Sequence, residues 1–207
     1  MLTKNQLTTI ILIAALVWGG LLVTQGVAVS ASWFKPLTAV IGAMMAILAA
    51  FNLWLWRLPI FRGWLVKRPV IAGTWKAHVR PTWIDPSTDA AKDPFIAYMV
   101  VRQTYASLSM RLLTAESSSV ALAADFDISA DGLFTVSGVY RNEPRMAVRD
   151  QSAMHHGALL LQVVGTPPST LRGHYWTDRR STGDLELTDR RDRVFDDFAS
   201  ASAIKQG

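Results

Sequence analysis

Two long apolar stretches near the N-terminus constrain this chain more than any other feature. Residues 7–29 and 37–56 contain no charged side chain. Each stretch is as long as the roughly 20 residues that an α-helix needs to cross a hydrocarbon core of about 30 Å. Because backbone polar groups in lipid must be satisfied within their own segment, both stretches are expected to be helical. The sequence therefore predicts a two-helix transmembrane hairpin over residues 1–56.

The basic residues around the two stretches predict how the hairpin is oriented. Lysine and arginine favour the cytoplasmic side of a membrane. Only Lys35 lies between the stretches, whereas basic residues flank the outer ends (Lys4, Arg57, Arg62, Lys67 and Arg68). We therefore expect a multi-pass inner-membrane protein with both termini in the cytoplasm. The alternative is a signal peptide cleaved near residues 28–30, although its apolar core would exceed the usual 7–15 residues.

The remainder of the chain has the pattern of an all-β domain. Short runs rich in Val, Thr, Tyr, Leu and Ala alternate with clusters of Gly, Pro, Asp and Ser, which is typical of sandwiches and barrels. Strands are expected at 71–80, 95–103, 107–113, 119–128, 133–141, 157–164, 170–178 and 183–188. Eight strands in this length favour a small closed up-and-down barrel, since closure removes exposed edges.

These patterns divide the chain into four segments. After the hairpin, residues 57–69 form a basic, aromatic juxtamembrane linker, and residues 70–190 form the barrel. A polar loop is expected at 85–93. Residues 191–207 form a charged C-terminal tail, with a helix expected near 194–203.

Composition and motifs exclude several function classes. The chain has no cysteine, so disulfides and thiolate chemistry are absent. Its net charge of +5 permits an anionic ligand, but it is weaker than DNA- or RNA-binding domains usually show. No hydrolase elbow, phosphate-binding loop or zinc motif occurs. His155 and His156 are adjacent and would point to opposite faces of a strand. We therefore expect no enzyme activity, no metal and no cofactor.

Strand alternation suggests which side chains line the barrel interior, because successive residues point to opposite faces. Tyr140 and Asn142 share the apolar face of their strand, and Tyr175, Thr177 and Arg179 share a face of another. Trp75 and Arg102 are further candidates. Aromatic rings stack on bases, Asn matches base edges, and Arg binds phosphate. Alternatively, the tyrosines are ordinary core residues and Arg179 is a solvated turn residue.

Several local motifs suggest a family. They are Gly73-Thr74-Trp75, Tyr140-Arg141-Asn142-Glu143-Pro144, His156-Gly157, Gly173-His174-Tyr175-Trp176-Thr177-Asp178-Arg179 and Thr182-Gly183. Together with two N-terminal spans and a basic junction, they resemble the two-transmembrane β-barrel effectors of bacterial CBASS antiphage systems. The resemblance covers nearly the whole chain.

The resemblance implies a cyclic-dinucleotide receptor. Its ligand would be made by a partner CD-NTase after infection, and binding would promote homo-oligomerisation and inner-membrane disruption, leading to growth arrest or cell death. By position, Tyr140, Asn142, Thr177 and Arg179 become ligand candidates, and Arg180 leaves open which arginine faces the pocket. A different class of function is a membrane-tethered, lipocalin-like carrier or assembly factor for a small apolar ligand.

Overall fold

The chain divides into two compact units, Met1–Trp56 and Arg57–Gly207. The computed structural model describes residues 4–26, 34–82, 84, 92–150 and 152–203. Most of the expected connection at 30–36 and of the polar loop at 85–93 lies outside the described residues, as does the possible cleavage region at 28–30.

The first unit consists of two helices, α1 (Lys4–Thr24) and α2 (Phe34–Leu53). Neither helix has an acidic residue in its first turn or a basic residue in its last turn. Within the described part of the chain, no helix combines the length and apolarity that a membrane span requires. The transmembrane hairpin thus stays a prediction from the sequence.

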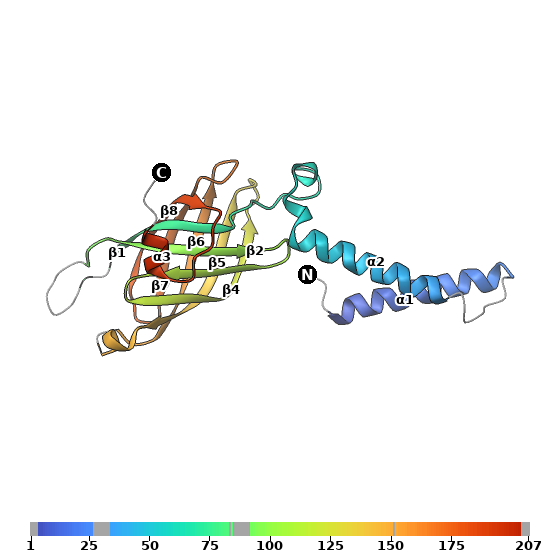
Figure 1. The fold of residues 1–207 in the computed structure, drawn as a ribbon, viewed down its shortest axis with the longest axis horizontal. Coiled ribbons are helices and arrows are strands. Elements are labelled where there is room, and N and C mark those ends of the chain that lie inside the picture. The colour runs from blue at the N-terminus through green and yellow to red at the C-terminus, as the bar shows by residue number, and fades with distance from the viewer. Residues whose placement is uncertain (1–3, 27–33, 83, 85–91, 151, 204–207) are drawn as a thin grey trace. The chain divides into compact units, whose positions relative to one another are not determined.

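The second unit is built around a closed barrel of eight strands (Figure 1). The strands are β1 (Gly73–Pro81), β2 (Phe95–Gln103), β3 (Leu108–Leu113), β4 (Ser117–Ile128), β5 (Phe134–Pro144), β6 (His155–Val164), β7 (Thr170–Thr177) and β8 (Thr182–Arg191). Each strand pairs antiparallel with the next, and β8 closes on β1. The predicted up-and-down barrel is confirmed.

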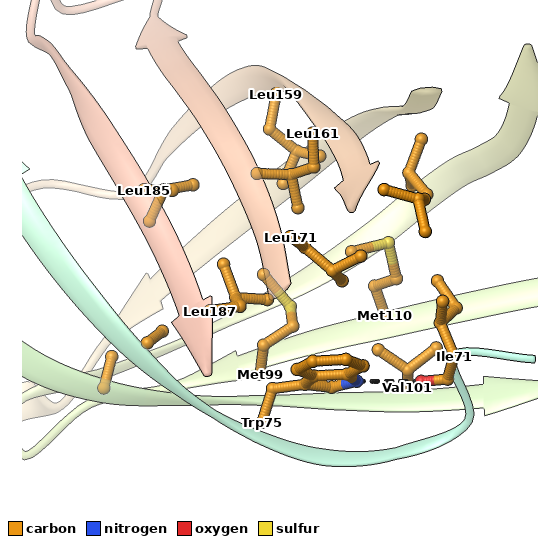
Figure 2. Close-up of a cluster of buried hydrophobic side chains, with 14 of the residues drawn as sticks. Ile71, Trp75, Met99, Val101, Met110, Leu159, Leu161, Leu171, Leu185 and Leu187 are labelled. Atoms are coloured by element: carbon orange, nitrogen blue, oxygen red, sulfur yellow. Dashed lines mark hydrogen bonds between the residues drawn. The ribbon is translucent and has the colours of Figure 1, made fainter. Parts of the chain in front are cut away.

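An apolar core fills the end of the barrel at which the β2–β3, β4–β5 and β6–β7 turns lie; we call this the closed end. Trp75 is 0% exposed and packs among inward-facing residues of neighbouring strands, including Met99, Val101 and Leu187 (Figure 2). Its indole nitrogen donates a hydrogen bond of 2.8 Å to the carbonyl of Ile71. This bond satisfies the one polar atom of a side chain that is otherwise surrounded by apolar groups.

The segment that precedes β1 is fastened to this closed end. It begins at Arg57, the last residue of the short 3₁₀ turn η2 (Leu55–Arg57), and contains a second 3₁₀ turn, η3 (Pro59–Phe61). Gln103, at the end of β2, is 5% exposed and accepts a hydrogen bond from the backbone of Ile71 while donating one to the carbonyl of Pro69, both at 2.9 Å. Arg57 donates to the carbonyl of Gln103 at 2.6 Å.

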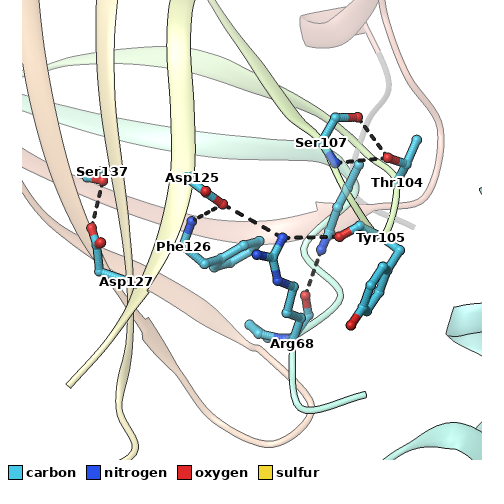
Figure 3. A network of polar contacts seen from close by, with 10 residues as sticks. Arg68, Thr104, Tyr105, Ser107, Asp125, Phe126, Asp127 and Ser137 are labelled. Atoms are coloured by element: carbon cyan, nitrogen blue, oxygen red, sulfur yellow. Dashed lines mark hydrogen bonds and ion pairs between the residues drawn. The ribbon is translucent and has the colours of Figure 1, made fainter. Parts of the chain in front are cut away.

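Arg68 adds a second attachment at the same end (Figure 3). Its guanidinium donates to the carbonyl of Tyr105 at 3.1 Å and lies 3.7 Å from the carboxylate of Asp125 on β4. It also lies 5.9 Å from the centre of the Tyr105 ring. Residues 57–72 are therefore part of the barrel unit rather than a free tether.

The C-terminal segment lies against the outside of the barrel. It ends in α3 (Phe198–Ala203), where Phe198 packs on Tyr98 of β2 with ring centroids 5.6 Å apart. The expected helix at 194–203 is present but starts four residues later. Asp197 accepts hydrogen bonds from the backbone and hydroxyl of Ser200, as a helix N-cap does. These bonds lower the pKa of Asp197.

Candidate functional site

A cavity of about 780 Å³ occupies the half of the barrel that the core leaves open. Its floor includes Met99, Met110, Leu159 and Leu185, which are also members of the apolar core. Its upper wall comes from the segments that connect β1 to β2, β3 to β4, β5 to β6 and β7 to β8. We call this the mouth end, and it lies opposite the closed end. An eight-stranded barrel is wide enough to hold one small ligand, and this volume is typical of ligand pockets.

Two tyrosines from different strands line the cavity. Tyr140 lies on β5 and Tyr175 on β7, separated by β6. Burial raises the pKa of both phenols, and the nearby Tyr175 adds to the effect on the pKa of Tyr140. Neither hydroxyl has a hydrogen-bond partner among the described side chains and backbone. Both hydroxyls can therefore donate to or accept from a ligand.

Glycines on the adjacent strands determine how these rings lie. Gly157 is the cross-strand partner of Tyr140, and Gly183 is that of Tyr175. A Cβ atom on Gly157 would come within 2.5 Å of the Tyr140 ring, and one on Gly183 within 2.7 Å of the Tyr175 ring. The hydroxyl end of each ring thus lies over the glycine of the neighbouring strand. A side chain at either glycine would displace the ring that the glycine now accommodates.

Two further polar residues of the lining are almost fully buried. Asn142 on β5 accepts a hydrogen bond of 2.8 Å from the hydroxyl of Ser119 on β4, its cross-strand partner. Thr177 on β7 bonds to the hydroxyl and carbonyl of Ser181 at 2.6 and 3.3 Å, and its oxygen accepts from the Ser181 backbone. The Thr177 hydroxyl therefore stabilises the β7–β8 turn.

Basic groups lie at the mouth of the cavity. Arg179 donates to the hydroxyl of Ser152 at 3.2 Å and to the carbonyl of Ala153 at 3.3 Å. Lys92 and His155 also contribute to the lining. Arg180 is not part of the lining. Of the two adjacent arginines, Arg179 is therefore the one that lines the cavity. The site thus combines an apolar floor, two tyrosines in its walls, and a polar mouth at which Lys92 and Arg179 lie together with Asp93 and Glu116.

Comparison with known protein families identifies the barrel. Residues 66–189 match a family model described as Cap15, cyclic dinucleotide receptor domain. The chain belongs to this family. The match covers more than half of the 207 residues and extends from the segment before β1 into β8. No curated protein matches the chain.

Membership of the Cap15 family confirms the resemblance seen in the motifs. The chain contains a cyclic dinucleotide receptor domain, and the matched family is a receptor family rather than a catalytic one. A cavity in the barrel with tyrosine, amide and arginine side chains in its lining agrees with that description. Among the described residues, no group of three or more His, Cys, Asp or Glu side chains could hold a metal ion.

The structure brings five of the seven sequence-predicted residues to one cavity. They are Tyr140, Asn142, Tyr175, Thr177 and Arg179. Their contact with a ligand stays a prediction. The other two lie elsewhere: Trp75 is sealed in the core, and Arg102 is exposed on the outer surface, 3.2 Å from Asp196. Strand β2 is apolar on both faces, so its alternation gave no indication that Gln103 rather than Arg102 faces inward.

Several residues that line the cavity are not predicted by the sequence. Ser119 belongs to a run of serines and alanines in β4, which offers almost no contrast between inward and outward positions. A register shift between Ala121 and Ala123 further obscures the alternation. Lys92 precedes β2, and His155 is the first residue of β6. At such positions strand alternation does not predict whether a side chain points inward. Both residues join the motif tyrosines in one lining only when the barrel closes.

Proposed function

We propose that this chain is a membrane-anchored antiphage effector whose barrel binds a cyclic dinucleotide. The proposal is supported by the cavity, which is lined by two tyrosine rings and the buried amide of Asn142 and has Arg179 and Lys92 at its mouth. A cyclic dinucleotide carries two bases and two phosphates, so it needs stacking surfaces, base-edge partners and positive charge. The cavity offers all three and no catalytic centre is required.

Each part of the ligand has a candidate partner in the lining. The exposed faces of Tyr140 and Tyr175 would stack on the bases, since every base has a π-face. Arg179 and Lys92 would interact with the phosphates near the solvent. Asn142 would contact a base edge. In this arrangement the bases enter the barrel while the anionic ring remains close to the mouth.

The membrane part of the proposal rests on the first unit. Its apolar stretches carry no charge over lengths that match a bilayer. Large apolar side chains of α1 and α2 are exposed in the unit: Leu12, Leu16, Val17, Trp18, Val23, Met44, Met45, Ile47 and Leu48. Such side chains would be covered by lipid. The distribution of Lys and Arg supports cytoplasmic termini in the inner membrane.

Ligand binding would act by shifting an equilibrium between protomers. A ligand shifts two states only if it binds one of them more tightly. We propose that the bound barrel favours self-association and that clustered hairpins disrupt the inner membrane, leading to growth arrest or cell death. The ligand would come from a partner CD-NTase.

A carrier for a small apolar ligand is the competing function, and the apolar floor of the cavity favours it. This function predicts co-purifying lipid, which native mass spectrometry of the detergent-solubilised chain would detect. A lipid-free protein that binds cyclic dinucleotides would exclude it.

The experiment that tests this function uses the full chain reconstituted into lipid vesicles that contain an entrapped dye. Addition of the cognate cyclic dinucleotide should increase crosslinking between protomers and release an entrapped dye. A Tyr140→Ala, Tyr175→Ala double variant should do neither. Crosslinking without leakage would contradict membrane disruption, and binding without crosslinking would contradict ligand-driven assembly.

A further inference from the structure

The loop at residues 58–67, which we call the entry loop, has a fixed shape. The backbone N–H of Val66 donates to the carbonyl of Phe61 at 2.8 Å, and that of Gly63 donates to the carbonyl of Val66 at 3.0 Å. Gly63 has a φ of +90°, a conformation that glycine adopts without strain and other residues rarely adopt. The loop therefore closes on itself and holds its side chains in defined directions.

Large apolar side chains of the entry loop are exposed. Ile60 is 72% and Trp64 is 71% exposed, and Leu58 and Leu65 are exposed as well. The indole nitrogen of Trp64 donates to the carbonyl of Ile60 at 2.7 Å, so the polar atom of this side chain is satisfied within the loop. The surface that remains is apolar. Apolar side chains that gather on a surface in this way mark a contact with an apolar partner.

Positive charge accompanies these apolar side chains. Arg62 and Lys67 of the entry loop are exposed. Residues 57–72 contain four basic residues and no acidic one. Of the three turns at the closed end, only the β4–β5 turn holds a charged residue, Asp131, and its carboxylate accepts the hydroxyl proton of Ser129. The entry loop is therefore both apolar and cationic.

A lipid surface fits this combination better than a protein partner does. Tryptophan is favourable at the level of the lipid headgroups, and lysine and arginine are attracted to anionic lipids. The entry loop also begins two residues after the apolar stretch 37–56, which we expect to cross the bilayer. The chain thus passes from the expected span almost directly into the entry loop, within reach of the headgroups.

The entry loop is joined firmly to the closed end of the barrel. The side chain of Gln103 donates to the carbonyl of Pro69 at 2.9 Å. Arg68, which follows the loop directly, donates to the carbonyl of Tyr105 and pairs with Asp125 (Figure 3). A contact between the loop and lipid would therefore set the direction of the whole barrel.

We propose that the entry loop lies in the headgroup layer of an anionic leaflet and holds the closed end of the barrel against the membrane, so that the mouth opens away from the lipid. This inference goes beyond the proposed function but rests on its membrane anchor. In this orientation an anionic ligand reaches the cavity from the cytoplasm without passing the anionic lipid surface, which would repel it.

The absence of cysteine allows this orientation to be measured with single labels. Leu133→Cys and Met146→Cys place a fluorescent donor on exposed residues just before and just after β5, at the closed end and at the mouth end. The full chain is reconstituted without ligand into vesicles of phosphatidylcholine and phosphatidylglycerol whose headgroups carry an acceptor in both leaflets. Energy transfer from position 133 should be at least about twice that from position 146, since β5 separates the two by about 25 Å along the barrel.

A loop variant tests whether the apolar side chains of the entry loop cause this orientation. Ile60→Ser, Trp64→Ser should bring the ratio of the two transfer efficiencies close to one. Val139→Ser, Trp176→Ser removes apolar side chains of similar size that are exposed on the outer wall of the barrel. This matched control should leave the ratio unchanged.

A second variant, Arg62→Gln, Lys67→Gln, tests the charge of the entry loop. The ratio should be higher in vesicles with phosphatidylglycerol than in phosphatidylcholine alone, and this variant should lose that dependence. Arg149→Gln, Arg180→Gln removes the same charge from exposed residues at the mouth end and is the matched control. A ratio that does not respond to phosphatidylglycerol would overturn the preference for anionic lipid.

The contrary results separate this inference from the proposed function. Equal transfer from the two labels, or more from position 146, would overturn the orientation and leave ligand binding and the membrane anchor intact. An unchanged ratio in the Ile60→Ser, Trp64→Ser variant would overturn the lipid contact and leave the apolar loop surface to a protein partner. A chain that does not float with the vesicles would contradict both the membrane anchor and the inference.

Discussion

The ring of Tyr140 lies over Gly157, its partner on the next strand, where a side chain would collide with the ring. A Cβ atom at Gly157 would come 2.5 Å from both Cζ and Oη of Tyr140, and 2.7 Å from the carbonyl oxygen of Trp176. The His156-Gly157 motif therefore has a structural meaning: the glycine gives the tyrosine a place to lie along the wall. The shape of the cavity depends on this pair.

Replacing Gly157 by alanine should therefore damage both stability and binding. The added methyl group forces the Tyr140 ring into the lumen or pushes the strands apart, which costs about 1–3 kcal/mol in overpacked sites. Denaturant unfolding of the full chain measures the loss of stability, and calorimetry measures the loss of affinity. For the stability measurement, Gly138→Ala is the matched control, because its Cβ would meet its nearest atom at 3.4 Å. Equal stability of the two variants would contradict the role given to Gly157.

The tyrosine rings should contribute to binding by stacking rather than through their hydroxyls alone. Removal of one stacked ring costs about 1–3 kcal/mol, which corresponds to roughly 5- to 150-fold in affinity. We expect Tyr140→Ala and Tyr175→Ala each to weaken cyclic dinucleotide binding within this range, and the corresponding phenylalanine variants to weaken it less. If phenylalanine and alanine variants lost the same affinity, the hydroxyl and not the ring face would be the important group.

Much of the fold could be predicted because its local signals agree. The turn residues Asp131 and Gly132 and the cis Thr166-Pro167 segment separate runs of strand-forming residues, and the bounds of β2 match the prediction. In β1, β5 and β7 the residues near the closed end of the barrel are apolar on one face of the strand. This pattern predicts that Trp75, Val136 and Leu171 point inward, and all three are buried. Parity then placed the motif tyrosines in the interior.

The site could be predicted only in part, because depth along the barrel axis is not encoded in alternation. Trp75 has the inward parity of a lining residue, but it lies at the closed end and is covered by core side chains. Arg102 is a predicted lining residue on β2, a strand whose two faces are both apolar. The outer face of β2 is apolar because Phe198, which is far away in the sequence, packs on Tyr98 there. Packing by a segment that is distant in the sequence cannot be recognised from the residues of the strand itself.

Arg179, at the mouth of the cavity, should act through its charge at a partly solvated position. Arg179→Gln should reduce affinity by about 3- to 10-fold at low salt and make binding less dependent on salt, since the contact is exposed and screened. Titrations at two salt concentrations measure both effects. Arg180→Gln removes the same charge from a residue outside the lining and serves as the control. Similar losses in the two variants would mean that general charge attraction accounts for the effect.

Alkaline pH should destabilise the barrel through its buried phenols. Burial raises the pKa of Tyr140 above its ordinary value of 10.0, so the native state keeps a proton that the unfolded chain releases. The corresponding stability is fully present below pH 10.0 and is lost as the pH rises further, toward the native pKa. Tyr140→Phe should show a shallower decline in unfolding free energy between about pH 9 and 11. Identical declines in the variant and the unsubstituted chain would exclude this phenol as the cause.

The open half of the barrel is expected to bind a cyclic dinucleotide, and titration calorimetry of the full chain in detergent measures this binding. A panel of cyclic dinucleotides should include at least one that binds with 1:1 stoichiometry per barrel, and Tyr140→Ala, Tyr175→Ala should lose that binding while remaining folded. Heat signals absent for every member of the panel, or binding that survives the double substitution unchanged, would contradict the account.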